Sequence, residues 1–248
     1  MKKSIFISIV FTVLALTIQA QNEIMYIMKN GNVVDQYNIS TEIDSIIFYE
    51  PEQSGGSFTD TRDGYDYRTI KIGNQEWMAE DLKYLPSVTG PGAISKTTPF
   101  YYVYDYEGTD VNTAKATSNY NTYGVLYNWL AAQNACPSGW HLPTDADWQE
   151  LTNYLGGPNN CAGKLKTSGT AESGTGLWAS PNTEATNESG FSALPGGHVY
   201  IYQNDGSFIH LGKYGYWWTA TETDSNDVWY RRMDYNNKKV LNNLSPKE

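Results

Sequence analysis

Two stretches in the middle of the chain have the hydrophobic spacing of helices. In residues 142–158, LPTDADWQELTNYLGGP, apolar side chains recur at intervals that place them on one helix face. They are Trp148, Leu151 and Leu155. Thr144 is suited to the N-cap, and Asp147 at the third helical position can complete a capping box. The Gly-Gly-Pro that follows is typical of a helix end.

The second predicted helix lies within residues 123–137, YGVLYNWLAAQNACP. Its apolar stripe consists of Val125, Trp129 and Ala132, with Leu126 and Leu130 beside it. The pattern ends at Cys136-Pro137, because the residue before a proline avoids the α region.

Strand patterns dominate elsewhere. Near the N-terminus, alternating apolar residues flank Asn30-Gly31, which favours a tight hairpin, and residues 43–49 form a further β-rich piece. Residues 67–82 predict two short strands that turn at Gly73-Asn74, and 214–222 and 228–235 predict more strands. Residues 86–122 predict a long loop with a short strand at 100–104. The pattern indicates an α+β fold in which antiparallel strands dominate.

The chain of 248 residues divides into four segments. Residues 1–20 have two lysines, an apolar run and a small final residue, the pattern of a signal peptide, and the run is shorter than the roughly 20 residues of a spanning helix. A small β module follows at 21–50, and a Pro-, Gly- and Ser-rich linker at 51–58 precedes the main domain, 59–248. We therefore expect a protein that is secreted, periplasmic or on the outer cell surface, and not membrane-spanning.

Charge and motifs exclude several functions. Without the two signal lysines, 15 basic face 27 acidic side chains, a net charge near −12, which repels phosphate backbones and argues against a nucleic-acid partner. No G-x-S-x-G motif or phosphate-binding loop is present. We expect His141 to be partly buried and bonded to backbone, because His198 and His210 are not spaced to join it around a metal. The prediction is that the protein is not an enzyme.

Several motifs resemble the Fibrobacter succinogenes major paralogous domain, over roughly residues 59–240. They are RDGYDYRTIKIGNQEWMAEDLKY, YGVLYNWLAA, CPSGWHLPTDADWQELTNYLGG, ATNESGFSALPGG and GYWWTATE. That domain is similar to the formylglycine-generating-enzyme and C-type-lectin-like fold group. The resemblance implies a C-type-lectin-like domain with two helices and twisted antiparallel sheets, and it brings no established activity.

The resemblance also bears on the two cysteines. Family members usually finish with a strand of the form Gly-Phe-Ser-Val-Arg-Cys, whereas this chain finishes with NNLSPKE, so we expect a C-terminally shortened copy. The missing cysteine is the usual partner of Cys136, and Cys161 becomes the candidate for a substitute disulfide. The late cysteine pair of formylglycine-generating enzymes is absent, since no cysteine follows Cys161.

In lectin-like folds the ligand surface lies on long loops and late strands, which here include residues 221–232. Aromatic residues make up 14% of the chain and supply flat apolar faces for sugar rings or protein anchors. The candidate ligand-binding residues are Trp218, Trp229, Tyr230 and Arg231. The same loop offers oxygen ligands of the type that calcium prefers. The candidate calcium ligands are Glu222, Asp224, Asn226 and Asp227.

The sequence thus predicts a secreted or surface-associated, non-catalytic binding protein that recognises a glycan or a protein. The alternative is a structural or interaction module of the bacterial envelope that binds an envelope protein and no sugar. Trp129, Trp148 and Trp217 are expected in the core, because large aromatic side chains are usually well buried.

Overall fold

The computed structural model describes residues 24–29, 32–38, 55–202 and 205–247. The chain consists of two units, Met1–Glu52 and Gln53–Glu248. The predicted signal peptide, the turn at Asn30-Gly31 and the β-rich piece at 43–49 lie outside the described residues.

The N-terminal unit contains an antiparallel hairpin of β1 (Ile24–Lys29) and β2 (Asn32–Asn38). The pairing runs from Ile24 opposite Asn38 to Lys29 opposite Asn32, with one irregularity between Ile27 and Met28. The predicted hairpin is therefore confirmed in its two strands.

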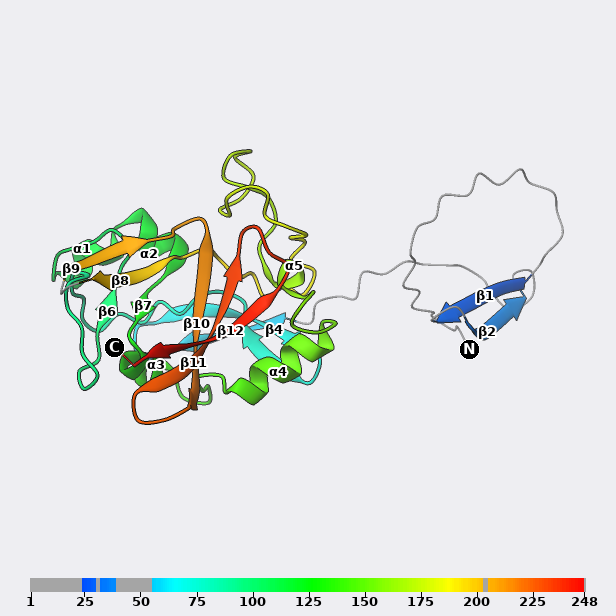
Figure 1. Cartoon of the computed structure of the whole chain (residues 1–248), viewed down its shortest axis with the longest axis horizontal. Coiled ribbons are helices and arrows are strands. Elements are labelled where there is room, and N and C mark those ends of the chain that lie inside the picture. Colours follow the sequence, from blue (N-terminus) through cyan, green and yellow to red (C-terminus); the bar gives the residue numbers. More distant parts are fainter. Residues whose placement is uncertain (1–23, 30–31, 39–54, 203–204, 248) are drawn as a thin grey trace. The chain divides into compact units, whose positions relative to one another are not determined.

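In its described residues, the larger unit combines short helices with four small antiparallel sheets (Figure 1). The two three-stranded sheets are β3 (Gly55–Asp60), β4 (Tyr65–Ile72) and β5 (Gln75–Met78), and β10 (Tyr214–Glu222), β11 (Asp227–Asp234) and β12 (Val240–Pro246). The two-stranded sheets are β6 (Tyr101–Tyr102) with β7 (Leu126–Tyr127), and β8 (His198–Tyr202) with β9 (Asp205–Ile209). The helices are α1 (Val111–Lys115), α2 (Ser118–Tyr123), α3 (Trp129–Ala135), α4 (Asp145–Tyr154) and α5 (Ala162–Leu165). This arrangement is of the mixed α+β kind that the sequence predicts.

The strand predictions hold with two changes. β4 and β5 turn at Gly73, whose φ of 62° is left-handed, as the sequence predicts. The linker prediction for 51–58 is partly wrong, because β3 begins at Gly55 and pairs with β4. Residues 240–246, for which the sequence predicts no strand, pair with β11 as β12.

Helix α4 begins and ends as predicted. The Oγ1 atom of Thr144 accepts a hydrogen bond from the Asp147 amide at 3.2 Å, and the Asp147 carboxylate accepts one from the Thr144 amide at 2.8 Å. Trp148 and Leu151 are buried on the inner face, and Gly156 and Gly157 have φ of 103° and 95° after the helix.

The other predicted helix is shorter than expected because Asn128 interrupts it. Its side-chain oxygen accepts hydrogen bonds from the amides of Ala131 at 3.0 Å and Phe100 at 2.9 Å, so it caps α3 and joins it to β6. The residues before Asn128 form β7 instead. Within the predicted loop, Asp110 and Thr117 cap two further short helices, α1 and α2.

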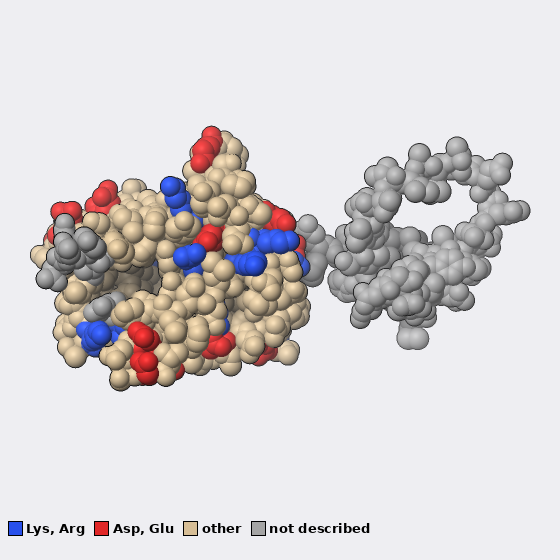
Figure 2. Space-filling view, viewed as in Figure 1, with Lys and Arg blue, Asp and Glu red and all other residues tan. Residues whose placement is uncertain are grey.

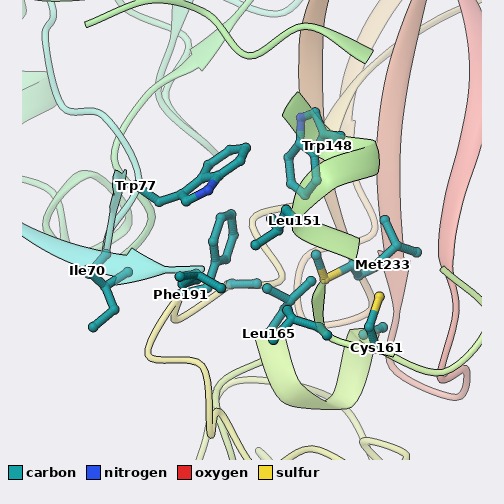
Figure 3. Close-up of a cluster of buried hydrophobic side chains, with 14 of the residues drawn as sticks. Ile70, Trp77, Trp148, Leu151, Cys161, Leu165, Phe191 and Met233 are labelled. Carbon is teal, nitrogen blue, oxygen red and sulfur yellow. The ribbon is translucent and has the colours of Figure 1, made fainter. Parts of the chain in front are cut away.

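The interior of the larger unit has two hydrophobic clusters. The first cluster joins β4, β5, α4, α5 and β11, and Figure 3 shows Trp77 and Trp148 above Phe191 within it. The second cluster lies among α1, α2, α3 and β6 and includes Tyr101, Val103, Tyr120 and Val125. The predicted burial of Trp129 and Trp148 is confirmed, and Trp217 packs partly buried on the first cluster.

The candidate disulfide between Cys136 and Cys161 is not formed, and both thiols are free. Cys161 is fully buried in the first cluster (Figure 3), whereas Cys136 is half-buried at the end of α3, outside that cluster. Burial raises the pKa of both thiols, that of Cys161 to about 11.

The capping box makes α4 sensitive to Thr144. Thr144→Ala removes the acceptor of the Asp147 amide and should lower the free energy of unfolding by about 1 kcal/mol, measured by urea denaturation. Thr144→Ser is the control, because it keeps the hydroxyl, and should stay close to the parent. An alanine variant as stable as the parent would contradict the role of the cap.

The thiols can be counted directly. Protein unfolded without reductant should react with two equivalents of a maleimide, and the Cys136→Ser variant with one. In the native protein the Cys161 thiol should react more slowly than that of Cys136, because it is enclosed by the core. Unfolded, unreduced protein that takes up no label would show that the cysteines are paired.

Candidate functional site

A cavity of about 1390 Å³ lies in the larger unit, bordered by residues of both hydrophobic clusters. Trp77, Trp148 and Phe191 line it from the first cluster and Val125 from the second. Figure 2 shows a hollow in this unit's face beside the β8–β9 hairpin. Sites for single small molecules measure roughly 300–1000 Å³, so this cavity is large enough for a chain-like ligand.

One wall of the cavity is a row of aromatic rings on the β10–β11 hairpin. Tyr216 lies opposite Arg232 and Trp218 lies opposite Tyr230, so all four side chains share one sheet face. The Tyr230 ring centroid is 5.9 Å from that of Tyr216 and 6.1 Å from that of Trp218. The Trp218 indole donates a hydrogen bond to the Tyr127 carbonyl at 2.7 Å, which fixes its orientation.

The opposite face of β10 carries Trp217, which packs against Trp148 and Phe191 at ring distances of 6.2 and 6.3 Å. Its side chain hydrogen-bonds the carboxyl group of Asp81, a further lining residue. Burial raises the pKa of Asp81 to about 7, although the bond from Trp217 and the charge of Lys83 act in the other direction. Asp81 is therefore a carboxyl group that changes its charge near neutral pH.

A second titratable group, His198, lies against the Tyr216 ring at 4.4 Å, with His210 at 5.2 Å. Burial, followed by the nearby His210 and Arg232, lowers the pKa of His198 to about 4, so the ring is neutral at pH 7. Its Nδ1 atom is buried and has no hydrogen-bond partner among the described residues.

The structure brings two of the four predicted ligand-binding residues to the cavity, Trp218 and Tyr230. Trp229 and Arg231 do not line it, because alternate residues of a strand face opposite ways. Arg231 is 5% exposed and forms an ion pair with Asp145 of α4, so its charge is paired within the fold.

Two of the four predicted calcium ligands, Asp224 and Glu222, bind groups of the protein itself at the β10–β11 turn. The Asp224 carboxylate accepts hydrogen bonds from the amides of Asn226 and Asp227 at 2.7 and 2.9 Å, and Glu222 pairs with Lys247 at 2.6 Å. In the part of the chain that the structure describes, no three His, Cys, Asp or Glu side chains are grouped so that they could hold a metal ion. The calcium prediction for this loop is therefore not supported by the arrangement of its residues.

The prediction that His141 is partly buried is wrong. Its side chain is 73% exposed, and its Nε2 atom lies 3.2 Å from the Asp147 carboxylate.

Sequence reasoning missed Asp81, Tyr216, His198 and Arg232 as members of one site. More than one hundred residues separate Asp81 from the others, so no local spacing connects them. The only available signal was a pair of acidic residues, Glu80 and Asp81, close after the second predicted strand.

These features define a small α+β domain with an aromatic cavity between two cores. The sequence of the Fibrobacter succinogenes major domain family matches residues 70–245, and the chain belongs to that family. Neither a curated protein nor a solved structure matches the chain. No helix among the described residues is long and apolar enough to cross a membrane.

The raised pKa of Asp81 predicts a pH-dependent penalty to stability. The unfolded carboxyl group titrates near 3.8 and the folded one near 7, so the native state binds more protons in between and loses stability as the pH rises through this window. Asp81→Asn removes the titration. Relative to the parent, this variant should gain on the order of 2 to 3 kcal/mol between pH 5 and pH 8, measured by urea denaturation.

Asp147→Asn is the matched control, because hydrogen bonds from Thr144 and the neighbouring His141 lower the pKa of Asp147 despite its partial burial. This variant should be less stable than the parent at both pH values. An Asp81→Asn variant whose stability relative to the parent does not change with pH would contradict the burial of a titrating carboxyl group.

Proposed function

We propose that the larger unit is a non-catalytic binding module of an exported protein, and that its ligand, a glycan or a protein segment, occupies the aromatic cavity. The proposed export rests on the signal-like residues 1–20. The proposed C-type-lectin-like relationship rests on the sequence motifs quoted above and on the combination of short helices with small antiparallel sheets.

One observation carries the proposal: the row of Tyr216, Trp218 and Tyr230 along the cavity wall. Aromatic faces stack on sugar rings and apolar side chains, and rings held in place before binding lose little entropy when a ligand arrives. The bond from Trp218 to the Tyr127 carbonyl provides this restraint. Asp81, a polar group at the cavity wall, supplies orientation.

The proposal can be tested on an array of bacterial and plant glycans and on a library of short peptides, each with and without calcium. Trp218→Ala should weaken the binding of whatever ligand the parent retains by at least about tenfold, because it removes a stacking surface. Trp229→Ala is the control, since Trp229 lies on the other face of β11 and does not line the cavity. Circular dichroism establishes that each variant is folded.

Two results would overturn the proposal. One is a ligand that binds the folded Trp218→Ala variant as tightly as the parent. The other is the absence of binding on both arrays, which would favour the alternative of an envelope interaction module without a cavity ligand.

A further inference from the structure

On the edge of β10 that faces away from β11, backbone hydrogen bonds to other described residues form at the two ends of the strand. The part between them is open, because its backbone groups have no such bonds. The Gly197 amide donates to the Tyr214 carbonyl at 2.9 Å, and the Ala220 amide donates to the Pro143 carbonyl at 2.9 Å. Strand β10 is also the edge strand of its sheet, in the order β10, β11, β12. The backbone groups of Tyr214 and Ala220 that form these bonds therefore point away from β11.

In an antiparallel ladder, every second residue directs its backbone N–H and C=O groups to the same side. The backbone groups of Tyr216 and Trp218 therefore also point away from β11. The Tyr235 amide donates to the Lys213 carbonyl. At the start of β10, the backbone groups of the odd-numbered residues therefore point towards β11. The outward N–H and C=O groups of Tyr216 and Trp218 form no hydrogen bond with any described residue. Unpaired backbone groups along a sheet edge are a template on which an extended chain can add a strand, so this edge offers a place for a partner.

This open edge runs along the cavity. Gly197 and Pro143, which close the two ends, line the cavity, as do all three residues from Tyr216 to Trp218. A chain laid against β10 would place alternate side chains on the two faces of the extended sheet. One face presents Tyr216 and Trp218, and the other presents Trp217.

The Trp217 face has polar groups that lack partners suited to them. Asp81 forms no ion pair with any described residue. Trp148 is 1% exposed and lines the cavity, yet its indole nitrogen has no hydrogen-bond partner among the described residues. Figure 3 shows that nitrogen on the side of the ring away from Leu151. A carboxyl group among indole rings suits a cationic side chain, which can pair with Asp81 and lie on the aromatic faces.

We infer that the cavity binds an extended peptide that pairs with β10 at Tyr216 and Trp218 and directs a basic side chain towards Asp81. A peptide fits the edge better than a sugar, because one extended residue presents an N–H and a C=O on the same side, as Tyr216 and Trp218 do. The net negative charge of the chain, with 27 acidic against 17 basic residues, also favours a basic partner. This inference rests on the proposed function and names its ligand class.

The full chain can be titrated with the capped tripeptide acetyl-Val-Lys-Val-amide, with binding followed by calorimetry and tryptophan fluorescence. In the antiparallel register, the two valines lie opposite Trp218 and Tyr216 and the lysine lies opposite Trp217. N-methylation of either valine removes an N–H that points at β10 and should weaken binding by at least about tenfold. N-methylation of the lysine is the matched control, because its N–H points away from β10, and binding should be unchanged.

The charge is tested separately. Replacing the peptide lysine by neutral norleucine should weaken binding about tenfold to the parent protein and have little effect on binding to the Asp81→Asn variant. Three results would each overturn the inference. The first is an equal effect of N-methylation at all three positions, and the second is an equal preference of both proteins for lysine over norleucine. The third is no binding of the peptide. Glycan binding that depends on Trp218 in a protein that ignores the peptide would leave the proposed function standing and refute only the peptide.

Discussion

Among the described strands, β10 pairs with a neighbour on one edge only, and this constraint organises the larger unit. On the paired edge, β11 fixes the register that sets Tyr216 opposite Arg232 and Trp218 opposite Tyr230. The period of two then sends Trp217 into the first hydrophobic cluster and its neighbours to the cavity wall. A shift of one residue would exchange these roles and expose the core tryptophan. The same strand thus holds the core together and shapes the candidate site.

Local chemistry was enough to predict some elements in detail. The α4 helix follows from Thr144, Asp147 and the apolar face, because caps and periodicity act over a few residues and need no tertiary partner. The turn at Gly73 could be predicted for the same reason. By contrast, the predicted second helix begins late, at Trp129, because the side-chain oxygen of Asn128 caps it and also accepts a hydrogen bond from Phe100, a residue distant in the sequence. Propensity cannot anticipate a bond of that kind.

The candidate site was harder to predict than the fold. Trp218 and Tyr230 were predicted as candidates because the ligand surface of lectin-like folds lies on long loops and late strands. Arg231 was predicted without its partner, since the sequence does not show that α4 supplies Asp145. Asp81 was missed because its significance depends on burial beside Trp217, which no neighbouring residue indicates. Side-chain partners across the fold therefore decide which polar residues remain available for a ligand.

The position of the cavity between two separate clusters has a thermodynamic consequence. Each cluster buries its own apolar residues, and the volume between them contributes no packing of its own. A molecule that fills this volume contacts both clusters, so its binding energy adds to the cohesion of the whole unit. By linkage, a ligand present at one hundred times its dissociation constant would stabilise the folded chain by about 2.7 kcal/mol. Occupancy of the cavity would then lengthen the lifetime of the folded protein.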